Sequence, residues 1–488
     1  MSTPIARSLI WLTIAEILFT LSGYIIHAVA GRILGPADYG RYGLVVTFTT
    51  TVIILIGNGI PTAMSRYLSE HFEHAPEMVS IIKRTSARLQ MILIGAITVI
   101  FFLVSPLIAA LLGDPSLTPL FRLSSLILPA FAASSFYFYY FTGIHLFHYQ
   151  AILKMVRSVL RIIIIVSLVI FFKITGAITG YIIVPFLTFL LGAFFDWKTG
   201  APFVAQDKTR SFSWQKLLAS AWPITLFLLF YEIFISIDLY LVKSILADDT
   251  QTGLYNAALT LGRIPYYLFY ALSIVLLPSL AKLKNANDPE KVNQLMSQSL
   301  RYAGIILLPV FILIASYAQP LIELFFGSKF SDGADTLRIL TFGLSFLTIF
   351  YVICMGLIGL GRAHLAMWIA IVGTGVNALC NALLIPKFGI EGAAWATTIT
   401  ATLTTVATLL IMQLYIPLSY RFVPIAKTVF ATVVLAFGAY LFPSSSSYFI
   451  FPASVLGCGY FAFLFFLRVL TKKDLVAFKE IFPSKQTL

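Results

Sequence analysis

The octapeptide PLIAALLG at residues 106–113 returns, in altered form, as PLIELFFG at residues 320–327. Further short matches occur at nearly the same spacing, 213 to 216 residues. They are Gly40-x-Tyr42 with Gly253-x-Tyr255, Glu16 with Glu232, Ala75-Pro76-Glu77 and Arg88 with Asp288-Pro289-Glu290 and Arg301, and Leu120-Phe121-Arg122-Leu123 with Thr336-Leu337-Arg338-Ile339. Each match is weak alone, but a shared spacing is hard to obtain by chance. The chain therefore contains two related halves, and in membrane proteins such halves usually enclose a pocket between them.

The composition is that of a membrane protein. Hydrophobic residues make up 59% of the chain, charged residues only 11%, and the mean hydropathy is +0.93, whereas soluble domains carry about 25% charged residues. Continuous apolar runs without alternation favour helices over a β-barrel. The expected fold is an all-α polytopic membrane protein with about fourteen spans, at residues 8–34, 42–64, 88–112, 118–142, 152–172, 176–197, 216–246, 252–280, 301–326, 336–360, 364–385, 391–416, 420–442 and 446–470.

The net charge of +13 is explained by topology. If the N-terminus is cytosolic and the loops alternate, 24 of the 33 Lys and Arg residues lie on the cytosolic side and 8 on the outer side, with Arg263 inside a span. This bias predicts a multi-pass protein of the cytoplasmic membrane with both termini in the cytosol. A nucleic-acid partner is not expected. The first apolar run passes Gly31 and is too long for a cleaved signal peptide.

The spans divide as six, six and two. Six lie in residues 1–200 and six in residues 214–416, with the polar segment 201–213 between them, and two lie in residues 417–488. An even number of spans per repeat gives both copies the same orientation, so we expect two parallel lobes with a cavity between them. The last two spans match neither lobe. Three scattered cysteines predict neither a disulfide framework nor a metal site.

Charged side chains inside spans are candidates for function because placing a charge in hydrocarbon costs about 2.5–3.5 kcal/mol. In the first span Glu16 and His27 share one helical face, and in the seventh span Glu232 and Lys243 do the same. Both pairs are separated by about 16 Å along a helix. We interpret them as two stripes that line the cavity between the lobes. The alternative is that each acid is neutralised by a neighbouring span.

A further group surrounds Arg263 in the eighth span. Its helical face also carries Asn256, Tyr267 and Tyr270. An arginine at this depth requires a partner, water or an anionic ligand, so we interpret Arg263 as part of the cavity lining. The alternative is an ion pair with Glu232 or Asp238. Asp238 lies off the face of Lys243 and would reach it only if the helix were irregular.

A basic triad of Lys154, Arg157 and Arg161 occupies one face at the cytosolic end of the fifth span. Two guanidinium groups and an ammonium group suit a phosphate, but topology alone also produces three basic residues at a cytosolic helix end. Tyrosines such as Tyr140 suit contact with sugar rings, and they also form ordinary interfacial belts. The sequence contains no phosphate loop, zinc-type His cluster or paired carboxylates with a nearby base, so no enzyme is predicted.

The segment GRILGPADYGRY at residues 31–42 resembles the opening signature of the polysaccharide-biosynthesis flippases. In that family an Arg-Leu-Gly-Pro-acid-Tyr/Phe-Gly run follows the first span. The segment FGIEGAAWAT at residues 388–397 is similar to the family's GxxGAAxAT segment. The resemblance covers essentially the whole chain and extends to the multidrug/oligosaccharidyl-lipid/polysaccharide exporter superfamily. The residues that match the opening signature are Arg32, Gly35, Asp38, Tyr39 and Gly40, and their position at the outer end of the span favours a structural turn.

The resemblance implies two six-helix lobes that form a V and open alternately to each side. It implies a flippase that moves a polyprenyl-diphosphate-linked oligosaccharide from the cytosolic to the outer leaflet, with a polysaccharide polymerase or other assembly enzymes as partners. The substrate-binding candidates are then Arg263, Lys243, Arg161, Arg157, Lys154 and His27, and the sugar-contact candidates are Tyr267, Tyr270, Asn256 and Tyr140. Candidates for a coupling H⁺ or Na⁺ are Glu16, Glu232 and Asp238.

Three other functions compete with this interpretation. A cation-coupled drug exporter of the same fold would favour an acidic, apolar cavity, whereas Arg263 and Lys243 favour an anion. If the protein were a flippase for the peptidoglycan lipid precursor, we would expect more cavity arginines in the first span. Only Glu16 and His27 occur there at mid-face. A membrane glycosyltransferase would need a carboxylate-bearing loop or a metal site outside the bilayer.

Overall fold

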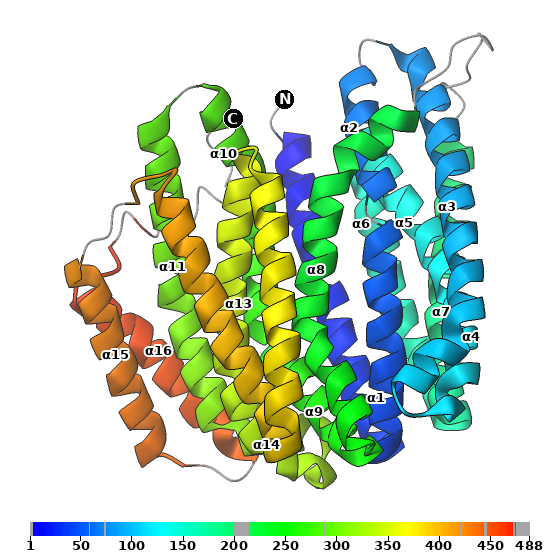
Figure 1. The fold of residues 1–488 in the computed structure, drawn as a ribbon. Coiled ribbons are helices and arrows are strands. Elements are labelled where there is room, and N and C mark those ends of the chain that lie inside the picture. Colours follow the sequence, from blue (N-terminus) through cyan, green and yellow to red (C-terminus); the bar gives the residue numbers. More distant parts are fainter. Residues whose placement is uncertain are drawn as a thin grey trace. The chain divides into compact units, whose positions relative to one another are not determined.

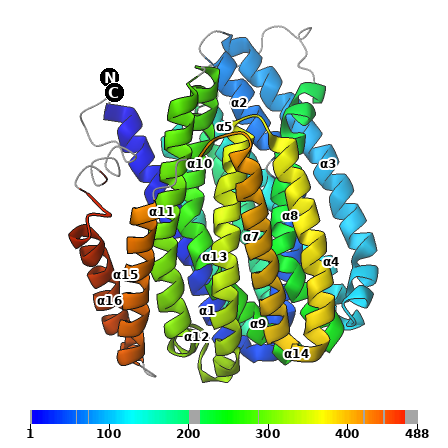
Figure 2. The ribbon, with the colours of Figure 1, turned by 60° about the vertical axis from the view of Figure 1, so that its left-hand side comes forward.

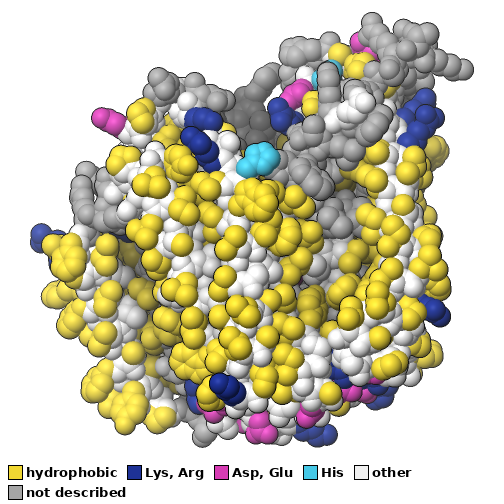
Figure 3. Space-filling model, in the orientation of Figure 1, with side chains coloured by type: hydrophobic (Ala, Val, Ile, Leu, Met, Phe, Trp, Pro, Cys, Tyr) yellow, Lys and Arg dark blue, Asp and Glu magenta, His cyan; other side chains and the backbone are white. Residues whose placement is uncertain are grey.

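A computed structural model describes residues 3–57, 59–72, 75–199, 214–286, 288–418, 422–443, 447–471 and 474. Every regular element in these ranges is a helix, which confirms the expected all-α class. Nine helices in the described part are long and apolar enough to cross a membrane. Apolar side chains cover the middle of the face shown in Figure 3, and most charged ones lie near its two ends. The chain is a multi-pass membrane protein.

The chain forms two compact units, Met1–Glu232 and Ile233–Leu488, and the division falls within α8 (Trp214–Leu246). The predicted boundary at residues 201–213 lies outside the described residues. Besides the first part of α8, the first unit contains α1 (Thr3–Gly57), α2 (Gly59–His71), α3 (Pro76–Leu111), η1 (Pro115–Leu117), α4 (Thr118–Ser125), α5 (Ile127–Gly143), α6 (Phe147–Leu160), η2 (Arg161–Ile165) and α7 (Val166–Thr199) (Figure 1).

The second unit contains the rest of α8 and the remaining helices. They are α9 (Asp249–Gly262), α10 (Ile264–Asn285), α11 (Pro289–Ser316), α12 (Ala318–Phe326), η4 (Ser328–Gly333), α13 (Ala334–Gly359), α14 (Ala363–Gln413), α15 (Phe422–Leu441), η5 (Ser447–Phe449) and α16 (Ile450–Phe466). The predicted apolar stretches fall mainly on these helices or on parts of them. How many cross the bilayer stays a prediction.

The long helix α1 consists of two legs that meet at Gly35. This residue has φ 74° and ψ 174°, a conformation that residues with a Cβ rarely adopt. His27 Nδ1 lies 3.0 Å from the Tyr39 hydroxyl, and the ring centres of His27 and Tyr42 are 5.9 Å apart. A straight helix would separate His27 and Tyr42 by about 22 Å. The chain therefore turns back at Gly35, between the first two predicted spans.

α7 and α14 are also pairs of legs. Their non-helical residues are Lys173 and Gly389. Residues far apart in sequence meet across the two bends, namely Gly180 with Ile165 and Asn377 with Thr397. The bends separate the fifth predicted span from the sixth and the eleventh from the twelfth.

In the second unit α13 is the central helix. It packs against α9, α10, α11 and α14, and 83% of its most apolar window is buried. Burial on all sides explains why α13 is apolar around its whole circumference. Helices α15 and α16 pack on each other and on α11 at one edge of this unit (Figures 1 and 2), where they form a separate cluster around Leu435, Tyr460 and Leu464.

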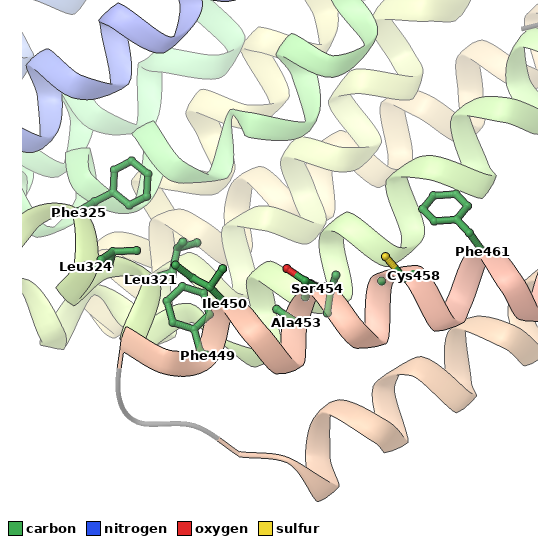
Figure 4. A pocket seen from close by; sticks show the side chains of 11 residues that line it. Leu321, Leu324, Phe325, Phe449, Ile450, Ala453, Ser454, Cys458 and Phe461 are labelled. Atoms are coloured by element: carbon green, nitrogen blue, oxygen red, sulfur yellow. The ribbon is translucent and has the colours of Figure 1, made fainter.

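An apolar pocket lies between α11, α12 and α16 of the second unit. Its lining includes Leu321, Phe325, Phe449, Cys458 and Phe461 (Figure 4). None of the charged residues selected from the sequence lines it. A surface of this kind is suited to hydrocarbon, and the charged candidates lie elsewhere.

Candidate functional site

In the first unit the basic triad surrounds one aromatic ring. Lys154 and Arg157 belong to α6, and Arg161 begins η2, a π-helical turn of a kind often found at functional sites. Lys154 Nζ and the guanidinium carbons of Arg157 and Arg161 lie 5.5, 5.5 and 4.5 Å from the centre of the Phe19 ring. An aromatic face attracts cations, so Phe19 of α1 stabilises three like charges in one place.

Arg157 is the deepest member of the triad, with only 5% of its surface exposed. Its Nη1 donates a 3.3 Å hydrogen bond to Ser134 Oγ, and its guanidinium lies 4.7 Å from the Phe131 ring centre. Its Nε has no hydrogen-bond partner among the described residues. No ion pair of the described residues involves Arg157 or Arg161. Because a buried charge without a counter-charge is costly, the two guanidinium groups favour an anionic ligand.

Arg161 connects the triad to a cluster of hydroxyl groups. Its Nη1 lies 3.4 Å from Ser22 Oγ, and its guanidinium carbon lies 5.9 Å from the Tyr181 ring centre. The hydroxyls of Tyr181 and Tyr42 share a 3.1 Å hydrogen bond. Charge and hydroxyl groups therefore adjoin, as a ligand with both phosphate and sugar groups requires.

Glu16 and His27 lie on the same leg of α1, and a common stripe of the two along the cavity stays a prediction. The Glu16 carboxylate forms an ion pair with Lys154 of α6, which is the alternative of neutralisation by a neighbouring helix. His27 instead bonds to the Tyr39 hydroxyl and packs on Tyr42. The Glu16–Lys154 pair cancels one charge of the triad. Within the described ranges the cluster therefore keeps two positive charges without a carboxylate partner, those of Arg157 and Arg161.

The opening signature builds the bend of α1. Gly35 provides the reversal, Tyr39 and Gly40 are buried in the returning leg, and Tyr39 bonds back to the first leg through His27. Arg32 is exposed and Asp38 is half-buried. This geometry agrees with the structural role expected for the signature.

The second unit contains a buried acidic site around Asp238, which is 0% exposed. The carboxylate accepts hydrogen bonds from the Tyr255 hydroxyl and from Thr397 Oγ1, the latter at 3.1 Å. Asn377 Nδ2 lies 3.5 Å from Thr397 Oγ1, and Asn381 Nδ2 bonds to the Asn377 carbonyl oxygen. Asn381 Oδ1 is buried and has no hydrogen-bond partner in the part of the chain that the structure describes. Carboxylate, hydroxyl and amide oxygens are the ligands that hard cations prefer.

Lys243 and Arg263 occupy different surroundings. Lys243 is 4% exposed and forms an ion pair with Asp249 rather than with Asp238. Arg263 lies at the break between α9 and α10, where its Nη2 donates a 2.8 Å hydrogen bond to Ser236 Oγ. The charge of Arg263 also acts on the Asp238 carboxyl. The two interpretations of Arg263 made from the sequence, a lining of the cavity or an ion pair with Glu232 or Asp238, stay predictions.

The described sugar-contact candidates differ in their exposure. Tyr140 is 2% exposed in a core cluster with Phe136 and Phe141, beneath Lys83, and Asn256 is 3% exposed. Tyr267 is 43% exposed and has its ring 5.3 Å from that of Tyr266. The side chain of Tyr270 lies outside the described residues. Glu232 is half-buried at the division between the units.

The cationic and acidic sites occupy equivalent positions of the internal repeat. Ser22, Arg161 and Tyr181 of the first unit correspond, 216 residues later, to Asp238, Asn377 and Thr397 of the second. In the first unit Arg161 contacts Ser22 and Tyr181, and in the second unit Thr397 contacts Asp238 and Asn377. One unit therefore places arginine where the other places an amide, and serine where the other places a carboxylate.

Sequence reasoning missed Phe19, Ser22, Asn377 and Thr397. A phenylalanine, two hydroxyl residues and a buried amide carry no functional signal in an apolar chain. The repeat contained the missing signal, because adding its spacing to Arg161 and Tyr181 gives Asn377 and Thr397. Phe19 has no such signal, since only the packing of α6 on α1 makes it central.

Comparison with known families gives two matches. The model of the family described as "Polysaccharide biosynthesis protein" matches residues 5–284, and the MatE model matches residues 223–383. The chain is 24% identical over 353 residues to the succinoglycan biosynthesis transport protein ExoT of Rhizobium meliloti, covering 70% of this chain and 67% of that protein. It is 21% identical over 195 residues to the probable low-salt glycan biosynthesis flippase Agl15 of Haloferax volcanii, covering 40% of this chain and 41% of that one.

Among solved structures, the fold is similar to that of the lipid II flippase MurJ in an inward closed conformation. The TM-score is 0.74 at 18% sequence identity, and the match covers 96% of this chain and 100% of the other. At this identity the likeness concerns the fold. It agrees with the architecture of the exporter superfamily that the sequence suggested.

Proposed function

Because the chain belongs to the polysaccharide biosynthesis protein family, we propose that it flips a polyprenyl-diphosphate-linked oligosaccharide from the cytosolic to the outer leaflet of the cytoplasmic membrane. The observation that carries the proposal is the Arg157–Arg161 pair, two guanidinium groups without a carboxylate partner among the described residues. Two relatives whose names refer to glycan transport or flipping support it.

The physical difficulty of this transport is the headgroup. A diphosphate and a polar glycan must cross about 30 Å of hydrocarbon while the lipid tail stays in the bilayer. Arg161 and Lys154 are partly exposed and are suited to direct contact with phosphate oxygens, while Arg157 adds its charge from beneath. Ser22, Tyr42 and Tyr181 adjoin them with hydroxyl groups suited to a sugar.

Alternating access is the proposed mechanism, with the two units tilting so that the site opens first to the cytosol and then to the outside. Both termini are proposed to be cytosolic, as the charge bias predicts. The chain is proposed to act as a transporter and not as an enzyme, and to work beside a polysaccharide polymerase or other assembly enzymes.

The Asp238 site is proposed to bind the coupling ion, either Na⁺ or H⁺. A buried carboxylate with hydroxyl and amide neighbours suits a small cation. The Asp238 site is the repeat equivalent of the cationic site in the first unit. Equivalent positions of the two units would then bind ligands of opposite charge.

The drug exporter remains the rival function, since the MatE model matches part of the chain. An exporter of organic cations requires an accessible acidic surface. The acid of the second unit is buried, and the corresponding site of the first unit is cationic. This arrangement favours an anionic substrate.

The test is translocation of a polyprenyl-diphosphate oligosaccharide in reconstituted vesicles. We expect Arg161→Gln to reduce transport strongly and Arg161→Lys to retain part of it. The matched control is Arg122→Gln, which removes an exposed arginine of α4 and should leave transport unchanged. Arg263→Ala removes a cation of the second unit, so its effect on transport distinguishes a role of that unit from a role of the triad. Transport of organic cations in place of the lipid would support the exporter.

A further inference from the structure

The bilayer around the basic triad presents a problem of selectivity. Phospholipids carry a single negative charge on each phosphodiester and are present in large excess over any lipid-linked glycan. Two guanidinium groups beside an open surface would bind them as well as the intended headgroup. A site for a rare diphosphate lipid therefore needs a device that rejects single charges.

Glu16 has the geometry of such a device. It lies on the same leg of α1 as Phe19, less than one helical turn before it, and its carboxylate is bonded to Lys154. The Glu16 side chain is 37% exposed and that of Lys154 22% exposed, so both can be reached by a ligand. The ion pair thus occupies a partly exposed cation of the triad.

We propose that Glu16 is an internal anion that holds Lys154 in the absence of substrate and that only a multiply charged phosphate displaces it. The proposal rests on the proposed function, because it assigns selectivity to the same anion site. A single phosphodiester bound at Arg161 has no second charged group to place on Lys154, so it leaves the Glu16–Lys154 pair intact. A diphosphate can bind Arg161 with one phosphate and Lys154 with the other, and it thereby replaces the carboxylate.

Displacement is feasible because the ion pair is partly exposed. Pairs of this kind contribute only a small net free energy, since water competes for both groups. Once released, Lys154 stays near the site because Phe19 attracts its ammonium group. Phe19 is therefore a positioning residue, which keeps the lysine available whether or not Glu16 holds it.

The test measures binding rather than transport. Full-length protein in phosphatidylcholine nanodiscs is titrated with farnesyl diphosphate and with dihexanoylphosphatidylglycerol, a phosphodiester probe with a single charge. Wild type should bind the diphosphate well and the phosphodiester weakly. Glu16→Gln should tighten diphosphate binding about two- to fivefold and phosphodiester binding by a larger factor, so that selectivity falls.

Two variants test the assigned partner. Lys154→Gln should weaken diphosphate binding, and adding Glu16→Gln to it should change little, because the competing pair no longer exists. The matched control is Glu70→Gln, which breaks the exposed Arg66–Glu70 pair of the same unit and should leave both affinities unchanged. Should Glu16→Gln prove poorly folded, Glu16→Asp keeps the charge while shortening its reach, and it should give an intermediate gain.

The outcomes separate the two proposals. If wild type binds neither phosphate compound, the anion site of the proposed function is wrong. If wild type binds the diphosphate but Glu16→Gln binds it equally or more weakly, the anion site stands and the competition proposed for Glu16 is refuted.

Discussion

Lys173 and Gly389 share an unusual backbone conformation across the internal repeat. Lys173 has φ 54° and ψ −131°, and Gly389, 216 residues later, has φ 58° and ψ −138°. Other residues with positive φ also recur at spacings of 212 to 216, namely Gly35 with Ala247, Gly113 with Gly327 and His145 with Gly361. Most of these pairs differ in residue type. The recurrence therefore supports the repeat independently of the residue matches from which it was predicted.

The Lys173–Gly389 pair predicts opposite effects of substitution. A residue with a Cβ is strained in this conformation. We expect Lys173→Gly to raise the free energy of unfolding by about 1 kcal/mol and Gly389→Ala to lower it by about 1–3 kcal/mol. Thermal unfolding in detergent measures both. Gly304→Ala is the control, because a Cβ there meets no atom within 4 Å, and it should stabilise slightly. A less stable Lys173→Gly protein would contradict the assigned strain.

Phe19 should act through its aromatic face rather than its volume. We expect Phe19→Leu to weaken binding of farnesyl diphosphate by about 0.5–2 kcal/mol, because three cations lose their shared ring. Phe19→Tyr keeps the ring and should bind nearly as wild type. Calorimetric titration in nanodiscs measures the affinity. Equal losses in both variants would mean that Phe19 only fills space.

Asp238 should determine coupling without determining substrate binding. We expect Asp238→Asn to abolish the dependence of transport on a Na⁺ or H⁺ gradient, because the buried carboxylate is lost. Binding of diphosphate to the first unit should persist. Gradient-driven and gradient-free uptake in vesicles, each with Na⁺ and H⁺ varied separately, identifies the ion. Unchanged gradient dependence in Asp238→Asn would remove this residue from the coupling mechanism.

Asp474, which follows α16, should make a pH-dependent contribution to stability. Burial acts to raise the pKa of Asp474, but hydrogen bonds from Thr471 and Tyr302 and the charge of Arg301 outweigh it and hold the pKa below its ordinary value. A lowered carboxyl pKa stabilises the folded state at neutral pH, and this stabilisation is lost as the pH falls through the folded-state pKa.

We therefore expect Asp474→Asn to lower the unfolding temperature at pH 7 and to have a progressively smaller effect as the pH falls below about 4. Thermal scans in detergent across this range measure the difference. Asp335→Asn, which removes a largely exposed partner of Arg338, should have little effect at any pH. A constant difference between Asp474→Asn and wild type down to pH 3 would exclude the electrostatic origin.

Much of the architecture was predictable because it depends on local rules. Apolar length predicts helices in hydrocarbon, and the repeat predicts two related halves. The structure also explains why two equivalent positions of the repeat are glycine. A Cβ at Gly176 would collide with the Leu168 carbonyl oxygen, and one at Gly392 with that of Leu384, again at a spacing of 216. The GxxGAAxAT segment therefore contains glycine where the two legs of α14 approach each other.

The candidate site was only partly predictable, because charge pairing depends on neighbours. The sequence placed Glu16 and His27 on one helical face and Glu232 and Lys243 on another, but it did not indicate that Glu16 pairs with Lys154 and Lys243 with Asp249. The sequence by itself determined the membrane class, the internal repeat and the basic face of α6, all of which follow from composition and periodicity along one helix. Only the tertiary structure decided which cations keep a free charge. That choice is made between helices, where the packing of α6 on α1 brings Glu16 to Lys154 and leaves Arg157 and Arg161 beside Phe19.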